Sequence, residues 1–374
     1  MKSALTTLAL TAVCTLSGLT APAAELPLDK IKLPDGFSIS VYGDNVFGAR
    51  SMALGTQGTL FVGSQQSGRI RALVDTDGDN KADKIYVIAE KLWWPNGVAF
   101  RDGSLYVAEI NRIIRYDDIE NKLDAPPEPV VLVDDLPEKQ LHGWKYLNFG
   151  PDGKLYFGIG APCNDCDPME EFGDERFATI MRMNADGSEL EPYAHGVRNS
   201  VGFTWHPENG DLYFSDTGRD LMGDDIPDCE LNRATEAGQH FGFPYFHGGD
   251  VPDPTHGKGK NPDDYVKPIQ KMGPHVTPLG LTFYTGSQFP AEYKNRLFIA
   301  QHGSWNRSIK IGYRVMQVTL DETGNAASYK EFATGWLARG VPWGRPVDVL
   351  VAPDGALLVS DDKANVIYRI AYTG

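Results

Sequence analysis

His142 stands directly before a strand-forming segment, residues 146–149, at a position where a base could face a channel. A neutral imidazole accepts a proton near neutral pH, which a carboxylate of ordinary pKa does poorly. A histidine in such a loop is also a common structural residue, so both interpretations stay open from this residue alone. The chemical interpretation is general-base catalysis.

Three arginines lie in loops beside other strand-forming segments. Arg198, followed by Asn199, and Arg345 precede such segments, and Arg307 follows one. Converging guanidinium groups repel one another unless they meet anions, and arginine suits planar, bidentate binding of carboxylates. If they converge, they predict a small polyanionic ligand, for which Trp94 and Trp305 could supply flat faces. The alternative is local pairing with the plentiful Asp and Glu, and core packing for the tryptophans.

Two acidic loops could hold a metal ion. Around Gly218, Arg219 and Glu230, backbone carbonyls at a glycine-containing turn stand next to several carboxylates, and calcium prefers such hard oxygen ligands. A solvated acidic loop is the alternative. The second loop carries Asp75, Asp77, Asp79 and Asp83, and resembles the first half of a calcium-binding loop. It lacks the terminal glutamate of that motif, so a plain hairpin turn is equally compatible.

A short phrase repeated six times identifies the elements that position these residues. Each copy is a turn followed by Leu between strand formers, and the copies begin at residues 58, 103, 153, 210, 295 and 355. Spacings of roughly 45 to 85 residues are typical of four-stranded propeller blades. The sequence therefore predicts an all-β protein, a six-bladed β-propeller of four-stranded antiparallel blades.

The up-and-down order of strands assigns each loop to one face of the propeller. We expect His142, the arginines and the Gly218 loop on the face where inner strands begin, and the Asp75 loop on the opposite face. Residues 26–44 are expected to supply an outer strand to the last blade and close the ring. The longest interval, around residues 218–275, is expected to hold an insertion.

The N-terminus and the overall charge suggest where the protein acts. Residues 1–23 have the positive start, apolar stretch and small-residue cleavage site of a signal peptide, which leaves 24–374 as one propeller domain. The apolar stretch is too short to span a bilayer, so we expect no stable membrane anchor and a periplasmic or secreted, bacterial protein. The formal charge of −15 argues against nucleic-acid binding and favours a cationic carrier protein.

The cysteines do not form a recognisable haem or zinc motif. Cys163 and Cys166 are not followed by His, and no second cysteine pair completes a four-thiolate site. In an oxidising compartment we expect a disulfide between two of Cys163, Cys166 and Cys229.

Taken together, five segments resemble the soluble sugar dehydrogenases that depend on pyrroloquinoline quinone (PQQ), the glucose/sorbosone dehydrogenase group, and especially its sorbosone-dehydrogenase-like branch. The segments are residues 142–156, 196–203, 216–232, 302–307 and 344–349.

The resemblance implies PQQ at the channel mouth and oxidation of an aldose or a related sugar or aldehyde at C1. It makes His142 the base that takes the hydroxyl proton while hydride passes to the quinone. Arg198, Arg345 and Arg307 would pair with the cofactor's carboxylates, with Asn199 nearby. Calcium on the carbonyls of Gly218 and Arg219 would polarise the quinone oxygen.

The resemblance also implies that Glu230 binds a second, structural calcium. Two positions depart from the family pattern: Arg307 stands where a lysine is usual, and Asn96 is only a positional substitute for a glutamine. Electrons would leave to an external acceptor, a cytochrome c or a quinone, because the chain has no haem motif. The rival hypotheses are a calcium-dependent propeller lactonase or esterase, and a non-catalytic propeller scaffold.

Overall fold

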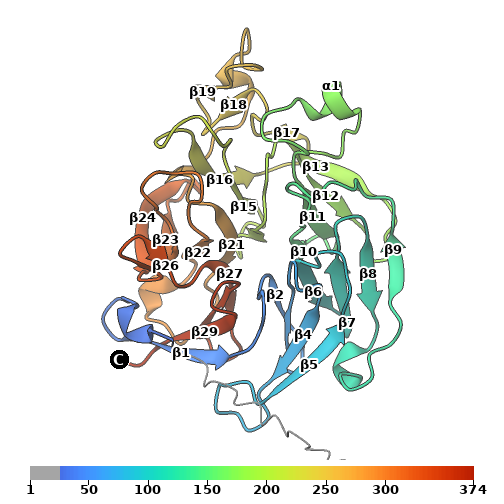
Figure 1. Cartoon of the computed structure of the whole chain (residues 1–374), viewed down its shortest axis with the longest axis vertical. Coiled ribbons are helices and arrows are strands. Elements are labelled where there is room, and N and C mark those ends of the chain that lie inside the picture. The colour runs from blue at the N-terminus through green and yellow to red at the C-terminus, as the bar shows by residue number, and fades with distance from the viewer. Residues whose placement is uncertain (1–25) are drawn as a thin grey trace, which may run out of the picture.

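A computed structural model describes residues 26–374, and these residues form a six-bladed β-propeller. Six sheets of mainly antiparallel strands surround a central axis, each with one edge strand nearest that axis (Figure 1). The blades are β2–β5 (Met52–Leu54, Leu60–Val62, Ile70–Val74, Lys84–Ala89), β6–β9 (Gly97–Arg101, Ser104–Ala108, Ile113–Tyr116, Val130–Val133), β10–β13 (Leu147–Phe149, Leu155–Ile159, Thr179–Met183, Glu191–His195), β14, β15, β16 and β20 (Phe203–Trp205, Leu212–Asp216, Asp228–Ala234, Gln270–Pro274), β21–β24 (Pro278–Phe283, Leu297–Gln301, Arg314–Leu320, Ala326–Ala333), and β27–β29 (Pro346–Val351, Leu357–Asp361, Val366–Tyr372) with β1 (Phe37–Gly43).

The repeated phrase marks the turn between the first and second strands of each blade. Its opening residues all have positive φ angles, between 57° and 88°. Glycine adopts this left-handed backbone at no steric cost, and asparagine tolerates it best among the other residues. Five copies therefore open with Gly, as at Gly58, and one opens with Asn295. The prediction of six blades from this phrase is confirmed.

The ring closes through the N-terminal strand. β1 pairs antiparallel with β29 in the last blade, from Phe37 opposite Tyr372 to Gly43 opposite Ile367. Pairing with β1 covers the edge of β29, so the last blade has four strands like the others. The predicted closure by residues 26–44 is confirmed.

The insertion is shorter than expected from the sequence. Within the predicted range 218–275, β16 and β20 are strands of the fourth blade, because their backbones pair with each other. The inserted segment between them, residues 235–269, contains β17 (Gln239–His240), β18 (Phe246–His247), β19 (Val251–Pro252) and the 3₁₀ turn η3 (Pro262–Asp264). β17 adds a parallel strand to the third blade and so ties the two blades together.

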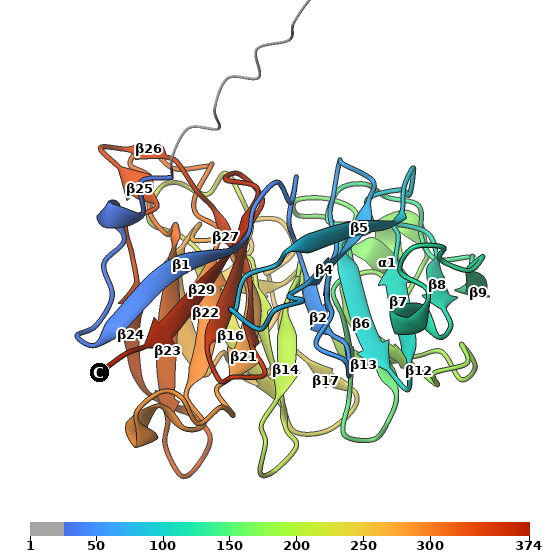
Figure 2. The ribbon, with the colours of Figure 1, turned by 90° about the horizontal axis from the view of Figure 1, so that it is seen from below.

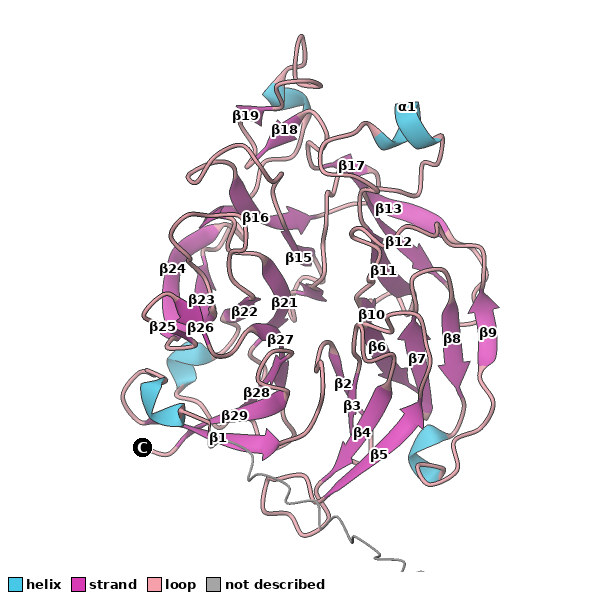
Figure 3. Cartoon of the chain, in the orientation of Figure 1, coloured by secondary structure: helices cyan, strands magenta, loops and turns pink. Residues whose placement is uncertain are grey.

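Helical structure is confined to short turns in the described chain (Figure 3). The α-helix α1 (Pro168–Phe172) lies in the connection from β11 to β12, and 3₁₀ turns occupy η1 (Leu28–Lys30), η2 (Ile119–Asn121) and η4 (Ala291–Tyr293). No helix among residues 26–374 is long and apolar enough to cross a membrane. The predicted signal peptide, residues 1–23, lies outside the described residues.

The propeller has two faces built from different loops (Figure 2). We call upper the face that carries the connections into the inner strands, including the hairpin β25 (Leu337–Ala338) and β26 (Val341–Pro342). The lower face carries the turns inside the repeated phrase, including η4. The apolar cores lie between neighbouring blades: Phe61 and Val107, for instance, belong to one cluster shared by the first two blades.

Candidate functional site

His142 lies on the upper face, immediately before the third blade's inner strand. Its backbone has φ +53°, and its Nδ1 lies 2.8 Å from the carbonyl oxygen of Ala161. A carbonyl only accepts hydrogen bonds, so Nδ1 carries the proton and Nε2 has a free lone pair. Burial, followed by the charge of Arg198, lowers the pKa of His142 to about 3, so the imidazole is neutral at physiological pH.

Gly160 is required beside this histidine. A Cβ at Gly160 would lie 2.5 Å from the Cβ of His142 and 2.7 Å from its carbonyl oxygen, closer than packed atoms approach. The backbone of the loop after β11 can therefore pass this close to His142 only because residue 160 has no side chain.

Arg198 is buried at the start of the fourth blade, with only 2% of its surface exposed. Its Nε and Nη2 donate to the backbone and side-chain oxygens of Asn164 at 3.0 and 2.8 Å, and its Nη1 donates to Thr217 O at 3.0 Å. The nearest carboxylate, on Asp220, is 3.4 Å from Nη2. Burial lowers the pKa of Arg198, and Asp220 and Asp216 oppose that shift.

Arg345 lies on the upper face, directly before β27, the inner strand of the sixth blade. Its Nε and Nη2 donate to the carbonyl oxygens of His302 and Gly303 at 3.1 and 3.0 Å, and no carboxylate lies within 4.0 Å of its guanidinium among the described residues. The charge of Arg345 is therefore held by backbone dipoles, and burial lowers its pKa. A guanidinium placed in this way keeps its affinity for an anionic ligand.

A histidine, a carboxylate and a second arginine stand next to Arg345. The Oδ1 of Asp362 lies 2.8 Å from His302 Nε2, and its Oδ2 accepts a bond from Arg50 Nη1 at 2.9 Å. Burial raises the pKa of Asp362, but His302 and Arg50 outweigh it and hold that pKa below its usual range. Burial lowers the pKa of His302 to about 4.

Arg307 lies further out than the other two predicted arginines. Its Nη2 donates to Asp225 Oδ1 at 2.8 Å, and Nε and Nη1 donate to the carbonyls of Asp224 and Ile309 at 3.0 and 2.7 Å. Its guanidinium is thus already paired with a local acid. Trp305, in the same loop, is 66% exposed.

Asn96 is fully buried, and its side chain is already hydrogen-bonded within the protein. Its Oδ1 accepts a bond from Arg50 Nε at 2.7 Å, and its Nδ2 donates to Ser51 Oγ at 3.1 Å and Lys145 O at 2.8 Å. Lys145 in turn donates from Nζ to the carbonyls of Ile110 and Gly143, and burial lowers its pKa to about 7. Asn96 therefore links the second blade by hydrogen bonds to the first and third blades.

These contacts join the predicted residues into one ring around the upper mouth. Ala161 donates its N–H to Arg198 O at 2.8 Å and faces His142 with its carbonyl, and Asp220 connects Arg198 to Asn306 in the loop of Arg307. Carbonyl groups of the same loop accept hydrogen bonds from Arg345. The ring is completed by the contacts among His302, Asp362, Arg50, Asn96 and Lys145.

Two buried carboxylates face each other beneath the Gly218 loop. Asp216 and Glu230 are cross-strand partners on β15 and β16, and Asp216 also accepts the N–H groups of Arg198 and Asn199 at 2.8 and 2.6 Å. Burial raises the pKa of Asp216 to about 6; burial and then the charge of Asp216 raise that of Glu230 to about 8. Thr217 Oγ1 and Asn232 Oδ1, one residue from Asp216 and two from Glu230, are buried without a hydrogen-bond partner.

This donor set fits a cation. Carboxylate, hydroxyl and amide oxygens are the ligands that calcium prefers, and a cation would stabilise both ionised carboxylates. Gly218 packs so closely against Asp228 that a Cβ there would lie 3.0 Å from Asp228 O. Arg219 uses its side chain elsewhere, in ion pairs with Asp165 and Asp253 that fasten the insertion to the third blade.

The Asp75 loop lies away from the ring, on the lower side of the first blade. It lines a pocket with Gly58 and Pro353, both from lower-face turns. Ligand atoms of Asp75, Asp77 and Asp83 lie within 4.8 Å of one another. Asp79 instead accepts the N–H of Lys81 at 2.8 Å. The loop can close as a turn without an ion, because Asp75 also accepts two backbone N–H groups.

A disulfide joins Cys163 and Cys166, one of the pairings left open by the sequence, and Cys229 is a buried free thiol. The two bonded cysteines flank Asn164, whose carbonyl and side-chain oxygens hold Arg198. The disulfide therefore fixes the loop that positions a predicted ligand-binding arginine.

Sequence reasoning missed Arg50, Asp362 and the role of Lys145. Arg50 stands just before the first inner strand, as Arg345 stands before the last, so the same positional rule applied to every blade would have found it. Asp362 and Lys145 carry no comparable signal, because their importance comes from contacts between blades.

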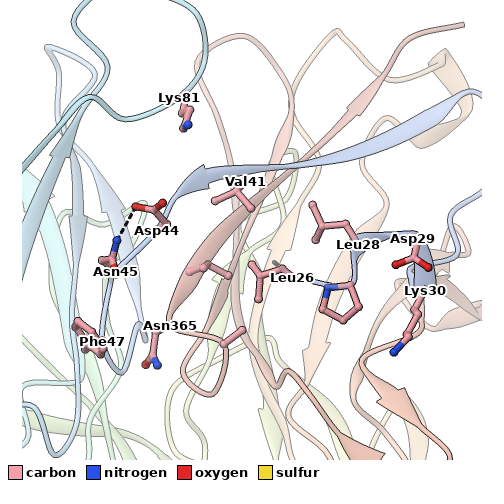
Figure 4. Close-up of a pocket in the computed structure, with 13 residues that line it drawn as sticks. Leu26, Leu28, Asp29, Lys30, Val41, Asp44, Asn45, Phe47, Lys81 and Asn365 are labelled. Carbon is pink, nitrogen blue, oxygen red and sulfur yellow. Dashed lines mark hydrogen bonds between the residues drawn. The ribbon is translucent and has the colours of Figure 1, made fainter. Parts of the chain in front are cut away.

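A larger pocket lies outside the ring, at the seam between the first and last blades (Figure 4). Its cavity of about 1060 Å³ is lined by Leu26, Leu28, Val41, Asp44 and Phe47 among others. It contains neither the histidines nor the arginines of the ring, so its size does not make it the chemical centre.

Solved structures with this fold include sugar-oxidising proteins. The calcium structure of the Trichoderma reesei family AA12 carbohydrate-active enzyme superposes with a TM-score of 0.77 and 18% identity, covering 91% of this chain and 97% of that one. The holo form of the pyranose dehydrogenase PQQ domain from Coprinopsis cinerea gives 0.75 at 18% identity, with the same coverage. The PQQ-bound aldose sugar dehydrogenase from Streptomyces coelicolor gives 0.63 at 20% identity, covering 91% and 99%. At identities this low, the superpositions establish a shared fold and nothing further.

At the level of sequence, residues 23–369 match the model of a domain of unknown function, DUF7133, and the chain belongs to that family. An uncharacterized protein of Borreliella burgdorferi is 34% identical over 97% of this chain and 96% of its own length. An uncharacterized protein of Synechocystis is 26% identical over 60% of this chain and 54% of its own.

Proposed function

We propose that this protein is a PQQ-dependent dehydrogenase that oxidises an aldose, or a related sugar or aldehyde of the sorbosone type, at C1. The observation that carries the proposal is the ring itself. It combines a neutral, oriented imidazole with one buried and one half-buried arginine, Arg198 and Arg345, whose guanidinium groups donate mainly to carbonyl groups. The solved structures of the same fold that contain PQQ give the cofactor its chemical identity.

Arg198 and Arg345 are the residues we assign to the cofactor's carboxylates. Arg198 is buried and Arg345 is half-buried, so an anion beside them would be only partly screened by water and would relieve the cost of removing their charges from solvent. Asn199 lies next to Arg198 on the same loop. We give Arg307 a secondary role, since its ion pair with Asp225, at 2.8 Å, is shorter than the 3.4 Å pair of Arg198 with Asp220. The proposal does not use Asn96, whose amide is fully occupied.

His142 is assigned as the general base. Its Nε2 can take the proton of the sugar hydroxyl, and the Ala161 carbonyl stabilises the imidazolium that forms by accepting the Nδ1 proton's hydrogen bond. PQQ, when bound, supplies the two-electron acceptor for the hydride from C1. The sugar thereby loses one hydride and one proton, and an aldose becomes its lactone.

Calcium is the metal we assign to the carboxylate pair and the loop above it. Asp216, Glu230, Thr217 and Asn232 offer buried oxygen atoms, and the carbonyls of Gly218 and Arg219 are the proposed ligands on the cofactor side. A calcium ion on the two carbonyls would act as a Lewis acid towards the quinone oxygen, and a second, structural calcium ion would bind at Glu230. For the Asp75, Asp77 and Asp79 loop we propose at most a structural ion, because that loop lies on the lower side.

Reconstitution tests the proposal directly. The purified apoprotein is titrated with PQQ in the presence of calcium and followed by absorbance and calorimetry, and then reduction of a dye is measured with a panel of aldoses. Saturable binding of about one PQQ per chain and sugar-dependent dye reduction are expected. Absence of PQQ binding would refute the assignment and would leave the lactonase and scaffold hypotheses.

We further propose that the protein is exported to the periplasm or secreted, as the predicted signal peptide and the Cys163–Cys166 disulfide suggest. Its partners would then be a sugar and an external electron acceptor. Quantifying the protein in periplasmic and cytoplasmic fractions tests this part separately.

A further inference from the structure

Exposed apolar side chains are distributed unevenly over the described surface. Thirteen large apolar residues are exposed, and the upper face holds nine of them, whereas the outer strands β5 and β9 hold the other four. The lower-face turns hold none. The nine are Phe47, Leu141, Met169, Phe172, Leu221, Ile226, Trp305, Ile309 and Val341. Apolar side chains gathered on one face, among polar neighbours, are typical of a contact surface.

One part of this face is also strongly acidic. We define the blade 3 rim as two segments, residues 134–141 and 169–175. The first precedes β10, and the second contains most of α1 and the residues that follow it. Its exposed carboxylates outnumber its single exposed cation, Lys139, six to one. They are Asp134, Asp135, Glu138, Glu170, Glu171 and Glu175.

The two segments of the blade 3 rim form one continuous surface. Arg176, at its edge, donates from Nη1 to Asp135 O at 2.9 Å, and the Lys139 ammonium lies 5.1 Å from the centre of the Phe172 ring. Below them, Leu136 and Phe177 belong to the same buried cluster. The exposed apolar residues of this rim, Leu141, Met169 and Phe172, therefore belong to the same two packed segments as the acids.

The blade 3 rim is covalently continuous with the ring. Leu141, 49% exposed, is the residue before His142, and the loop that carries α1 also contains Ala161 and Asn164, which contact His142 and Arg198. A protein docked on the blade 3 rim would therefore contact Leu141, the residue next to the proposed base, although α1 itself lies at the outer edge of the propeller (Figure 1). Electron transfer between proteins requires such closeness.

We propose that the blade 3 rim is the docking surface for a basic protein that carries one electron at a time, a proposal that rests on the dehydrogenase function above. Acidic groups around an apolar centre attract a positively charged partner from solution, and the apolar residues contribute once it is in contact. Oxidation of one sugar releases two electrons and two protons. Two oxidised carrier molecules take one electron each, and the protons pass to solvent.

Charge removal on the two faces tests the location. One variant carries Glu170→Gln, Glu171→Gln and Glu175→Gln on the blade 3 rim. The matched control carries Glu208→Gln, Glu292→Gln and Glu322→Gln, all exposed on lower-face turns, and changes the net charge by the same amount. The PQQ-loaded proteins are assayed with a basic c-type cytochrome and, in parallel, with a small neutral dye.

The rim variant should raise the KM for the cytochrome about 5- to 20-fold at low salt, and the difference should shrink as added salt screens the charges. Dye turnover should not change in either variant, and the control should keep the wild-type KM. Equal effects of the two variants would show that net charge, not the rim, steers the partner, and would overturn the proposal. An unchanged KM in the rim variant would overturn it too.

A binding measurement separates this proposal from the dehydrogenase function. Cytochrome binding to each protein is followed by calorimetry, without turnover, and Met169→Ser is compared with Val130→Ser on the outer strand β9. Met169→Ser should weaken binding about 3- to 10-fold without altering its salt dependence, while Val130→Ser should not. If dye reduction fails but rim-dependent binding persists, the dehydrogenase assignment is wrong and the docking surface stands. Rapid, salt-independent reduction of a soluble quinone together with no cytochrome binding would refute the docking surface.

Discussion

The Nδ1 atom of His142 lies 2.8 Å from the carbonyl oxygen of Ala161, and this one contact decides what the imidazole can do. It fixes the neutral tautomer in which Nε2 is unprotonated, and the positive φ of His142 holds the residue in a turn against Gly160. The same residue, Ala161, donates its N–H to the carbonyl of Arg198. The proposed base and the first proposed cofactor arginine are therefore positioned by a single residue.

Replacing His142 should abolish turnover and leave the cofactor bound. In His142→Asn the amide can still donate to Ala161 O, so the loop is supported, but no group can accept the sugar proton. We expect kcat to fall about 10²- to 10⁴-fold while PQQ affinity stays within a factor of a few. Steady-state dye reduction and absorbance titration measure the two quantities. His206→Asn, on the lower side, is the control; if His142→Asn kept its activity, another base, such as His302, would have to be invoked.

The low pKa of His142 also predicts how stability depends on pH. A folded-state pKa of about 3, below the ordinary value near 6.5, means that the unfolded chain binds the proton more readily. The free energy of unfolding should therefore fall as pH decreases from 6.5 towards 3, and His142 should contribute up to about 1.4 kcal/mol per pH unit. His142→Asn should lose less stability over this range. Urea unfolding at pH 8, 6 and 5 measures the slopes, and parallel slopes for both proteins would contradict the assignment of the shift to this residue.

The fold was predictable because its signals are local. The repeated phrase needs a left-handed residue at each turn, and Gly or Asn at residues such as Gly58 and Asn295 is visible in the sequence. The pairing of β1 with β29 followed from the need to cover an edge. The extent of the insertion did not follow, because β16 and β20 are recognised as blade strands only by their pairing across 35 inserted residues.

The candidate site was predictable only in outline. Loop positions indicated that His142, Arg198 and Arg345 belong to one face, and the contacts around the mouth join them. The hydrogen-bond partners of each side chain were not predictable. Asn96 was predicted to bind the cofactor, but its amide is hydrogen-bonded to Arg50 and Lys145. These contacts form only because three blades meet at the axis.

The environments of the arginines predict unequal contributions to cofactor binding. Arg345 is held by two carbonyls and no carboxylate within 4.0 Å among residues 26–374, whereas Arg307 already pairs with Asp225. Arg345→Gln should weaken PQQ binding about 10- to 100-fold, because a charge-assisted hydrogen bond to a buried anion is lost. Arg307→Gln should have a smaller effect. Calorimetric titration measures both against Arg314→Gln, a control whose guanidinium bonds to Gln301 and Glu331 within the fifth blade; equal losses for Arg345 and Arg307 would contradict this ranking.

Calcium should stabilise the apoprotein, and more so at higher pH. Burial raises the pKa of Asp216 to about 6, and burial with the charge of Asp216 raises that of Glu230 to about 8. Protons and calcium therefore compete for the same oxygens, and the rise in melting temperature on adding calcium should be larger at pH 8 than at pH 6. Glu230→Gln should abolish most of the rise, whereas Asp75→Asn, on the lower side, should preserve it. A rise that Asp75→Asn removes and Glu230→Gln keeps would move the principal ion to the Asp75 loop.

Removing the disulfide should affect ligand binding more than folding. The Cys163–Cys166 bond closes a loop of only a few residues, so the chain-entropy model gives it about 2 kcal/mol of stability. The loop nevertheless holds Asn164, which accepts two hydrogen bonds from the Arg198 guanidinium. The double variant Cys163→Ser, Cys166→Ser should therefore fold, melt a few degrees lower, and bind PQQ several-fold more weakly. Asn164→Ala, with the disulfide intact, should reproduce the loss of affinity without most of the loss of stability, because it removes the side-chain hydrogen bonds to Arg198 and to the backbone of Asp220 but keeps the covalent loop closed. Weaker binding in the double variant together with wild-type affinity in Asn164→Ala would show that the disulfide acts through another part of the loop.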